Sequence, residues 1–236
     1  MEDFLTDNGI LLKYNGHEKK VVIPEGVTAI GYAAFVDCHD PEEIILPDGV
    51  EKIGDSAFSD CVNVKKIHIP SGVRSIGYSS FLGCTSLARV DLPDTVVSIG
   101  NSAFYGCGSL EAFTLPDGVS VIEDFTFYNC ESMKEVRLPY GVRIIGYRAF
   151  YGCSGLARME LPGSVRVIGD GAFYFCLRLE EIRIPEGVEK IGESMFFDCN
   201  QLGRVILPES VREIGDSAFF ECGSLSGSTI PAGVRE

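Results

Sequence analysis

The chain has 236 residues and carries 34 acidic against 20 basic side chains, a formal net charge of −14 at pH 7. This negative charge repels phosphate groups and anionic lipid headgroups, so we expect no binding of nucleic acid. No apolar run reaches the ~18 residues of a membrane-spanning helix, so we expect no membrane insertion.

The first 22 residues differ from the rest of the chain. The start, Met1-Glu2-Asp3-Phe4, lacks the basic and long apolar regions of a secretory signal. We therefore expect either an intracellular protein or one whose signal has been removed. The pairs Asn8-Gly9 and Asn15-Gly16 stand between short apolar runs, which favours a β-hairpin. We expect residues 1–22 to form a hairpin cap over the open end of a core.

From residue 23 onward the chain repeats every 23 residues. The prolines of this series are Pro24, Pro47, Pro70, Pro93, Pro116, Pro139, Pro162, Pro185, Pro208 and Pro231. The cysteines keep the same spacing: Cys38, Cys61, Cys84, Cys107, Cys130, Cys153, Cys176, Cys199 and Cys222. A phenylalanine precedes each cysteine by three residues and an isoleucine precedes it by eight. Such a period predicts a solenoid, because each unit is too short to bury its own apolar face.

One unit reads L-P-x-G-V-x-x-I-G-x-x-A-F-x-x-C-x-x-L-x-x-V-x, and the recurring apolar residues predict inward-facing columns. Segments such as 135–138 are expected to pair in parallel with their equivalents 23 residues away, and the proline that follows ends each strand. The Asp-Gly or Glu-Gly pair after the proline predicts a turn. Asp55 and Asp216, before Ser-Ala-Phe, are expected to cap a short helical or 3₁₀ turn.

The phrase I-G-x-x-A-F-x-x-C-x-x-L resembles the BspA-like leucine-rich repeats over residues 23–236. The resemblance implies an α/β-type, mostly β leucine-rich-repeat solenoid of about nine repeats. It should form a curved right-handed superhelix with a parallel sheet on the concave side and short helical or 3₁₀ turns on the convex side. The chain ends inside a repeat, so we expect the C-terminal cap to be missing, which makes end-to-end self-association a further hypothesis. Phe113 and Glu123 break the consensus and predict a local bulge.

Nothing in the sequence has the pattern of an active site or a metal site. No C-x-x-C pair occurs, so zinc spacing is absent, and we expect a column of reduced, buried thiols. His17, His39 and His68 belong to no recognisable catalytic motif. We therefore expect a non-enzymatic protein without metal or cofactor.

The outward strand positions form the first candidate binding surface. Its basic candidates are Lys65, Lys66, His68, Arg89, Arg137, Arg158, Arg183 and Arg204. Lys65, Lys66, His68 and Arg89 form a basic cluster that could receive an acidic patch of a partner. The alternative is cross-strand pairing with the acidic residues of the same columns, which stabilises the sheet and leaves no net attraction.

An aromatic column forms the second candidate surface. It comprises Tyr105, Tyr128, Tyr151, Tyr174, Phe197 and Phe220. If exposed, it would be a protein- or glycan-binding stripe; if half-buried, it is packing along the convex wall. Val36, Ser59 and Leu82 hold the same position in the first coils, so the fold does not require a ring there.

The family resemblance implies protein–protein recognition or adhesion by a surface-associated protein of a bacterium or protist, secreted or on the cell surface. A second hypothesis is a cytoplasmic scaffold or sensor domain of a larger protein. A third is a carbohydrate-binding surface that uses the aromatic column.

Overall fold

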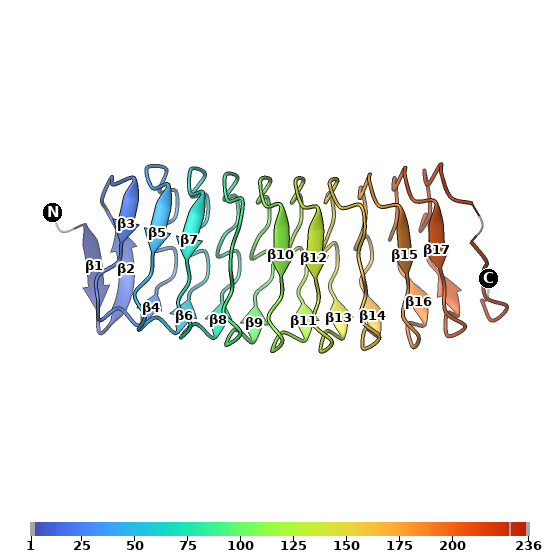
Figure 1. Cartoon of the computed structure of the whole chain (residues 1–236), viewed down its shortest axis with the longest axis horizontal. Coiled ribbons are helices and arrows are strands. Elements are labelled where there is room, and N and C mark those ends of the chain that lie inside the picture. Colours follow the sequence, from blue (N-terminus) through green and yellow to red (C-terminus); the bar gives the residue numbers. More distant parts are fainter. Residues whose placement is uncertain (1–2, 227, 235–236) are drawn as a thin grey trace.

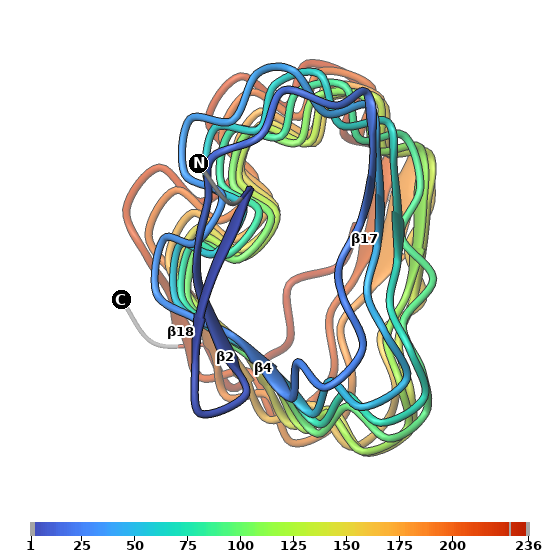
Figure 2. The same ribbon diagram turned by 90° about the vertical axis from the view of Figure 1, so that its left-hand side faces the viewer.

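The computed structural model describes residues 3–226 and 228–234 as a parallel β-solenoid of about nine turns. The coils stack in one row with the two ends of the chain at opposite ends of the row (Figure 1). Seen along that row, the coils superpose, with β17 on one wall and β2, β4 and β18 on another (Figure 2). Over the residues described, no helix is present that is long and apolar enough to cross a membrane.

The first wall carries strands of three residues, and we call it the strand face. Its strands are β3 (Lys20–Val22), β5 (Glu43–Ile45), β7 (Lys66–His68), β10 (Ala112–Thr114), β12 (Glu135–Arg137), β15 (Glu181–Arg183) and β17 (Arg204–Ile206). Partners stand 23 residues apart and run parallel, as in Ile44 opposite Ile67. The middle residue of each strand points into the core, and its two neighbours point outward, because side chains alternate along a strand.

A second wall carries strands of two residues. Its strands are β4 (Ala29–Ile30), β6 (Lys52–Ile53), β8 (Ser75–Ile76), β9 (Ser98–Ile99), β11 (Val121–Ile122), β13 (Ile144–Ile145), β14 (Val167–Ile168), β16 (Lys190–Ile191) and β18 (Glu213–Ile214). These also pair in parallel between coils 23 residues apart. The second residue of each strand is the isoleucine of the repeat, and from β4 to β16 it is buried. The Val-x-x-Ile-Gly phrase therefore forms the short extended segment that the repeat predicts.

The N-terminal residues form a hairpin of β1 (Phe4–Asp7) and β2 (Ile10–Tyr14), which pair antiparallel. Asn8 and Gly9 link them with φ angles of 46° and 78°, the left-handed values that a tight hairpin turn requires. Strand β2 then pairs in parallel with β4, and the Tyr14 ring stacks on Phe35 at 4.9 Å. The hairpin thus continues both the second wall and the core, and its role as a cap stays a prediction.

A third part of each coil, which we call the arc, runs from the glycine after the isoleucine to the cysteine. Here the structure corrects the expected helical or 3₁₀ turns: across the described residues the arc consists of turns. Hydrogen bonds alternate between two directions. The Ser56 and Phe58 N–H groups donate to Tyr78 and Ser80 of the next coil, at 2.7 and 2.8 Å, whereas Ser59 donates back to Ser56 at 3.0 Å.

The backbone angles of the arc explain why no helix forms. Two positions in every coil have positive φ, for example Ser56 at 53° and Asp60 at 57°. A 3₁₀ helix needs negative φ at successive residues, so these left-handed residues interrupt it. The left-handed residues turn alternate N–H groups toward the neighbouring coil.

The aspartate expected to cap a helical turn accepts a hydrogen bond from the next coil instead. The Asp55 carboxylate accepts the N–H of Tyr78, 23 residues later, at 2.9 Å. Asp124 does the same for Tyr147 at 2.7 Å. An aspartate at this position therefore ties one coil to the next instead of capping a turn of its own coil.

The core is a set of side-chain columns, of which the phenylalanine column is the largest. Rings from Phe35 to Phe219 stack in succession with centroids 5.1–5.8 Å apart. Each such pair stabilises the fold by roughly 0.5–1.5 kcal/mol beyond its burial. Because each ring contacts its neighbours in the adjoining coils, the column holds the whole row together.

Two larger core residues coincide with interruptions of the strand face. The strand-face sheet breaks between Val90 and Phe113 and again between Val136 and Met159. Phe113 packs edge-on between Phe104 and Phe127, each at 4.8 Å. The first interruption thus adjoins Phe113, one of the two departures from the consensus, while the local bulge expected there stays a prediction.

The left-handed positions give a testable prediction. Gly106 has a φ of 71° and Gly108 lies outside the left-handed region, while a Cβ at either would meet no atom closer than 3.8 Å. We expect Gly106→Ala to lower the free energy of unfolding by about 1–2 kcal/mol, because alanine is strained at the positive φ of position 106. Gly108→Ala should stay within about 0.5 kcal/mol of the parent. Equal urea-unfolding curves for the two variants would contradict this account.

Candidate binding surfaces

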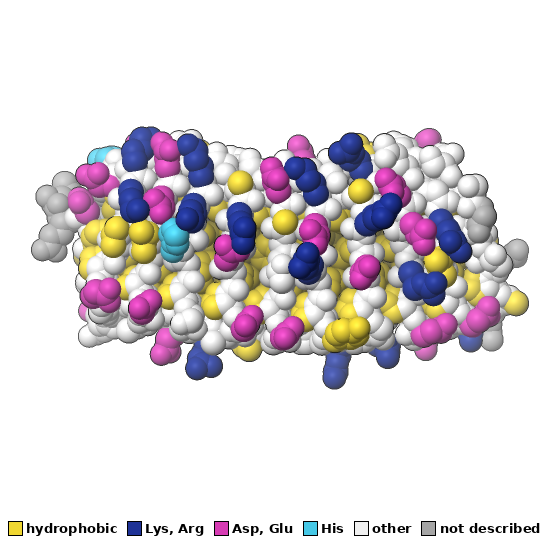
Figure 3. Space-filling view, in the orientation of Figure 1, with side chains coloured by type: hydrophobic (Ala, Val, Ile, Leu, Met, Phe, Trp, Pro, Cys, Tyr) yellow, Lys and Arg dark blue, Asp and Glu magenta, His cyan; other side chains and the backbone are white. Residues whose placement is uncertain are grey.

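The strand face brings all eight predicted basic residues onto one wall. Figure 3 shows Lys and Arg side chains interspersed there with Asp and Glu. In the N-terminal part, the Lys65 ammonium lies 2.8 Å from Glu42, and the His68 imidazole lies 3.0 Å from Glu43. Hydrogen bonds from Lys65 and Lys19 lower the pKa of Glu42, so this carboxylate stays charged. Lys65 and His68 of the predicted basic cluster are therefore paired with the preceding coil, whose Glu42 and Glu43 also pair with Lys19 and Lys20.

Ion pairs also involve other arginines of this face. Arg89 lies 2.8 Å from Asp91 and Arg137 lies 2.7 Å from Glu135, both pairs within one strand segment. Arg158 reaches Glu180 at 3.4 Å. In the part of the chain that is described, Lys66, Arg183 and Arg204 are exposed and form no ion pair. The strand face thus carries alternating charge rather than a positive field.

A depression of about 630 Å³ lies on the strand face at its first interruption. Small side chains from neighbouring coils, Ala88, Ala112 and Thr114, line it. A second depression, of about 650 Å³, lies at the second interruption, beside Met159. Both hollows therefore lie where the pairing of the strand face is interrupted.

The aromatic stripe, defined as Tyr105, Tyr128, Tyr151, Tyr174, Phe197 and Phe220, forms one continuous stack. Neighbouring ring centroids are 4.3–4.9 Å apart, with interplanar angles of 2–22°. The rings are half-buried except Phe220, which is 52% exposed. Burial raises the pKa of Tyr105 and of Tyr128; the Tyr128 hydroxyl adds to the rise at Tyr105, and the Tyr151 hydroxyl adds to the rise at Tyr128. Since each ring covers the face of the next, the stripe presents mainly ring edges and hydroxyl groups.

Beside the stripe lie four residues that the sequence analysis missed. Phe125 packs edge-on against Tyr147 at 5.2 Å, and Phe175 against Tyr174 at 4.5 Å. Both phenylalanines occupy left-handed positions, with φ of 56° and 57°. The Arg148 guanidinium lies over the Tyr147 ring at 4.9 Å.

These left-handed phenylalanines are unusual. A bulky residue with positive φ costs of order 1–3 kcal/mol, and such strain is concentrated at functional sites. In other coils the two equivalent positions hold mostly Ser, Asp or Gly, for example Ser56 and Asp60. That break in the pattern was the available sequence signal.

The cysteines form a buried column. From Cys61 to Cys222, each thiol donates to the carbonyl of the phenylalanine 26 residues earlier, at 3.0–3.3 Å. All nine are free thiols, and only Cys38 and Cys222 are half-buried rather than buried. Desolvation raises the pKa of Cys153 to about 12, so this thiol stays protonated and unreactive. Among the residues described, no group of three or more potential metal ligands gathers.

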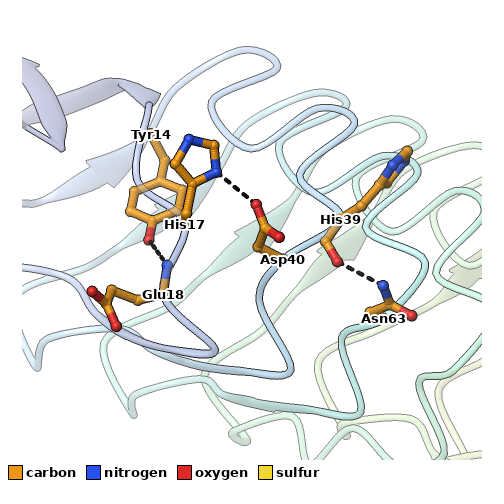
Figure 4. A network of polar contacts seen from close by, with 6 residues as sticks. All are labelled: Tyr14, His17, Glu18, His39, Asp40 and Asn63. Carbon is orange, nitrogen blue, oxygen red and sulfur yellow. Dashed lines mark hydrogen bonds and ion pairs between the residues drawn. The ribbon is translucent and has the colours of Figure 1, made fainter.

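The histidines do not converge on a common site. His17 and Asp40 form an exposed pair at 2.7 Å, and the Tyr14 hydroxyl accepts the Glu18 N–H at 3.2 Å nearby (Figure 4). The His39 ring points away from this pair, while its carbonyl accepts a hydrogen bond from Asn63 (Figure 4). His68 lies on the strand face.

Known proteins share both the repeat and the fold. The family model described as the BspA type leucine rich repeat region matches residues 13–134 and 120–236. No curated protein matches the chain in sequence.

Several bacterial proteins have a similar structure. A leucine rich cell surface protein from Faecalibacterium prausnitzii is 24% identical, with 95% of this chain and 92% of that chain covered and a TM-score of 0.59. A leucine-rich repeat protein from Bacteroides ovatus is 24% identical, with 98% and 87% covered and a TM-score of 0.50. The pneumococcal vaccine antigen PcpA is 16% identical, with 99% and 70% covered and a TM-score of 0.55. At these identities the likeness establishes the fold alone.

The cysteine column predicts selective alkylation. With iodoacetamide at pH 8, Cys38 and Cys222 should react in the folded protein, because they alone are partly accessible. The seven buried thiols should react only after unfolding in guanidinium chloride. Peptide mass spectrometry measures both sets, and native labelling of Cys107 as fast as Cys38 would refute the sealed column.

The His17 pair predicts a defined pH response. The hydrogen bond to Asp40 raises the pKa of His17, so Asp40→Asn should lower it, as followed by NMR titration of the ring protons. Because the folded pKa is raised, the pair stabilises the fold below the unfolded value of about 6.5, and this contribution is lost as pH rises through the folded pKa. An unchanged His17 titration in Asp40→Asn would contradict the assignment.

Proposed function

Because the chain belongs to the BspA-type leucine-rich repeat family, we propose that it is a protein-binding domain without catalytic activity, which acts in recognition or adhesion at a cell surface. A structural relative described as a cell surface protein supports this location. We also propose that residues 1–22 cap the repeats of residues 23–236. The row would then curve as a right-handed superhelix with the strand face on its concave side.

One observation carries the proposal: inward positions are nearly constant, whereas outward positions vary from coil to coil. The core column of the strand face runs through apolar residues such as Ile44, Ile67 and Val136, all buried. The outward position before each of these holds Glu43, Lys66 and Glu135. The fold therefore supports a long surface whose chemistry can change without loss of the core.

We propose the strand face as the leading surface for a protein partner. Its alternating charges would favour a partner with the complementary alternation, since such patterns contribute specificity more than affinity. Lys66, Arg183 and Arg204 are the basic residues that remain available for new pairs.

The aromatic stripe is less suited to carbohydrate. Sugars pack against the flat faces of aromatic rings, and in the stack from Tyr105 to Phe220 the neighbouring ring covers most of these faces. The stripe and its flanking Phe125 and Phe175 fit protein contact better, because ring edges and hydroxyl groups can pack and hydrogen-bond at an interface.

Affinity capture from cell-surface extracts tests the proposal. We expect the wild-type chain to capture a protein partner. With Lys65/Lys66/Arg89→Glu the captured amount should fall at least about tenfold, because the reversed charges no longer complement the charge pattern of the partner. The matched control, Lys13/Lys52/Arg74→Glu, makes the same charge change on the second wall and should keep the partner. Equal capture by both variants would move the site off the strand face, and no capture by the wild type would count against protein binding.

A further inference from the structure

The charge of the chain reverses locally over residues 139–169. This segment contains four arginines and one acidic residue, Glu160, for a formal net charge of +3. The preceding 23 residues, 116–138, have five acidic and two basic residues, for a net charge of −3. In a chain of net charge −14, these coils therefore differ in kind from their neighbours.

Two of the four arginines lie together on the second wall. Arg143 precedes β13 and Arg166 precedes β14, and the Arg166 N–H donates to the Arg143 carbonyl at 2.9 Å. Arg148 follows in the arc, over the rings of Tyr147 and Tyr151 at 4.9 and 5.4 Å. The positive charge thus runs along one coil from the second wall into the arc.

Exposed apolar groups accompany these arginines. Ile144 and Val167 are register partners, 39% and 52% exposed. Tyr140 is 89% exposed, in a turn position where most coils carry Asp or Glu, and Tyr147 is 37% exposed. We name the basic band by its six residues: Tyr140, Arg143, Ile144, Tyr147, Arg148 and Val167.

The band differs from the strand face in its ion pairing. Five of the eight basic candidates on the strand face lie against carboxylates. Within the described ranges, neither Arg143 nor Arg148 forms an ion pair.

Among the residues described, the carboxylates Asp124 and Asp170 that flank the band accept backbone hydrogen bonds and form no ion pair with its arginines. Of the flanking carboxylates, Asp124 accepts the Tyr147 N–H and Asp170 accepts the Glu193 N–H. Arg166 donates to the carbonyls of Gly163 and Glu186, which fixes it beside the band. Carbonyl groups carry no net charge, so the charge of Arg166 also remains.

We infer that the basic band binds an acidic peptide segment of a protein partner that also carries aromatic or apolar side chains. Guanidinium groups pair with carboxylates through two parallel hydrogen bonds, and Arg and Tyr dominate the energetics of protein interfaces. Acidic surface elsewhere on the chain repels such a segment and directs it to the band. The inference rests on the proposed protein-binding function and names a second surface for it.

The probe is a fluorescein-labelled peptide of four Glu-Glu-Tyr units, with binding followed by fluorescence anisotropy. Arg143→Glu/Arg148→Glu should weaken binding by at least about tenfold, because two attractive charges become repulsive. Lys13→Glu/Lys52→Glu makes the same charge change on the second wall outside the band and should alter binding by less than about twofold. Arg143→Gln/Arg148→Gln, with an unchanged thermal unfolding curve, should give an intermediate loss.

Three outcomes would overturn the inference. They are unchanged affinity in Arg143→Glu/Arg148→Glu, equal loss in Lys13→Glu/Lys52→Glu, and equally tight binding of a labelled twelve-residue oligothymidylate, which would indicate a general anion site. If the peptide assay fails while the wild type still captures a protein partner, the inference is wrong and the proposed function stands. If both fail, the proposed function is wrong as well.

Discussion

A coil of 23 residues has no interior of its own, and every structural feature of the chain follows from that constraint. Side chains such as Phe127 and Ile145 become buried only because equivalent residues lie directly before and after them. Each column must therefore keep its register, since an inserted residue would move every later side chain out of its column. The repeat runs from Pro24 to Pro231 without insertion or deletion, and the ring stack is continuous over the same coils.

The arc shows how the backbone meets the same constraint. Alternate N–H groups must reach the next coil while the chain bends through a tight curve, and left-handed residues make both possible. Gly, Asn, Asp and Ser suit such positions because they tolerate positive φ better than larger residues do. Phe125 and Phe175 are exceptions, and both lie against the aromatic stripe. Their strain is offset by ring contacts at a surface, which is where function usually lies.

The sequence predicts the interior well and the surface poorly, for a physical reason. Columns such as the cysteines follow from period alone, because burial is dictated by position in the repeat. The arc is where the sequence misleads, because Asp55 before Ser-Ala-Phe has the pattern of a local helix cap, whereas its hydrogen-bond partner Tyr78 is 23 residues away. Position in the repeat locates the basic residues of the strand face, but only coordinates reveal that Glu42 pairs with Lys65 and Glu43 with His68.

A charged surface attracts a partner only with the charge that its own neighbours leave unpaired. On the strand face, carboxylates alternate with the basic groups, and five of the eight basic candidates lie against one. Arg143 and Arg148 look like ordinary variable positions in the repeat, yet among the described residues neither of them forms an ion pair. Since the interior fixes only the inward columns, a reversal of charge in one coil leaves the fold unchanged. A repeat protein can thus acquire a distinct binding surface one coil at a time.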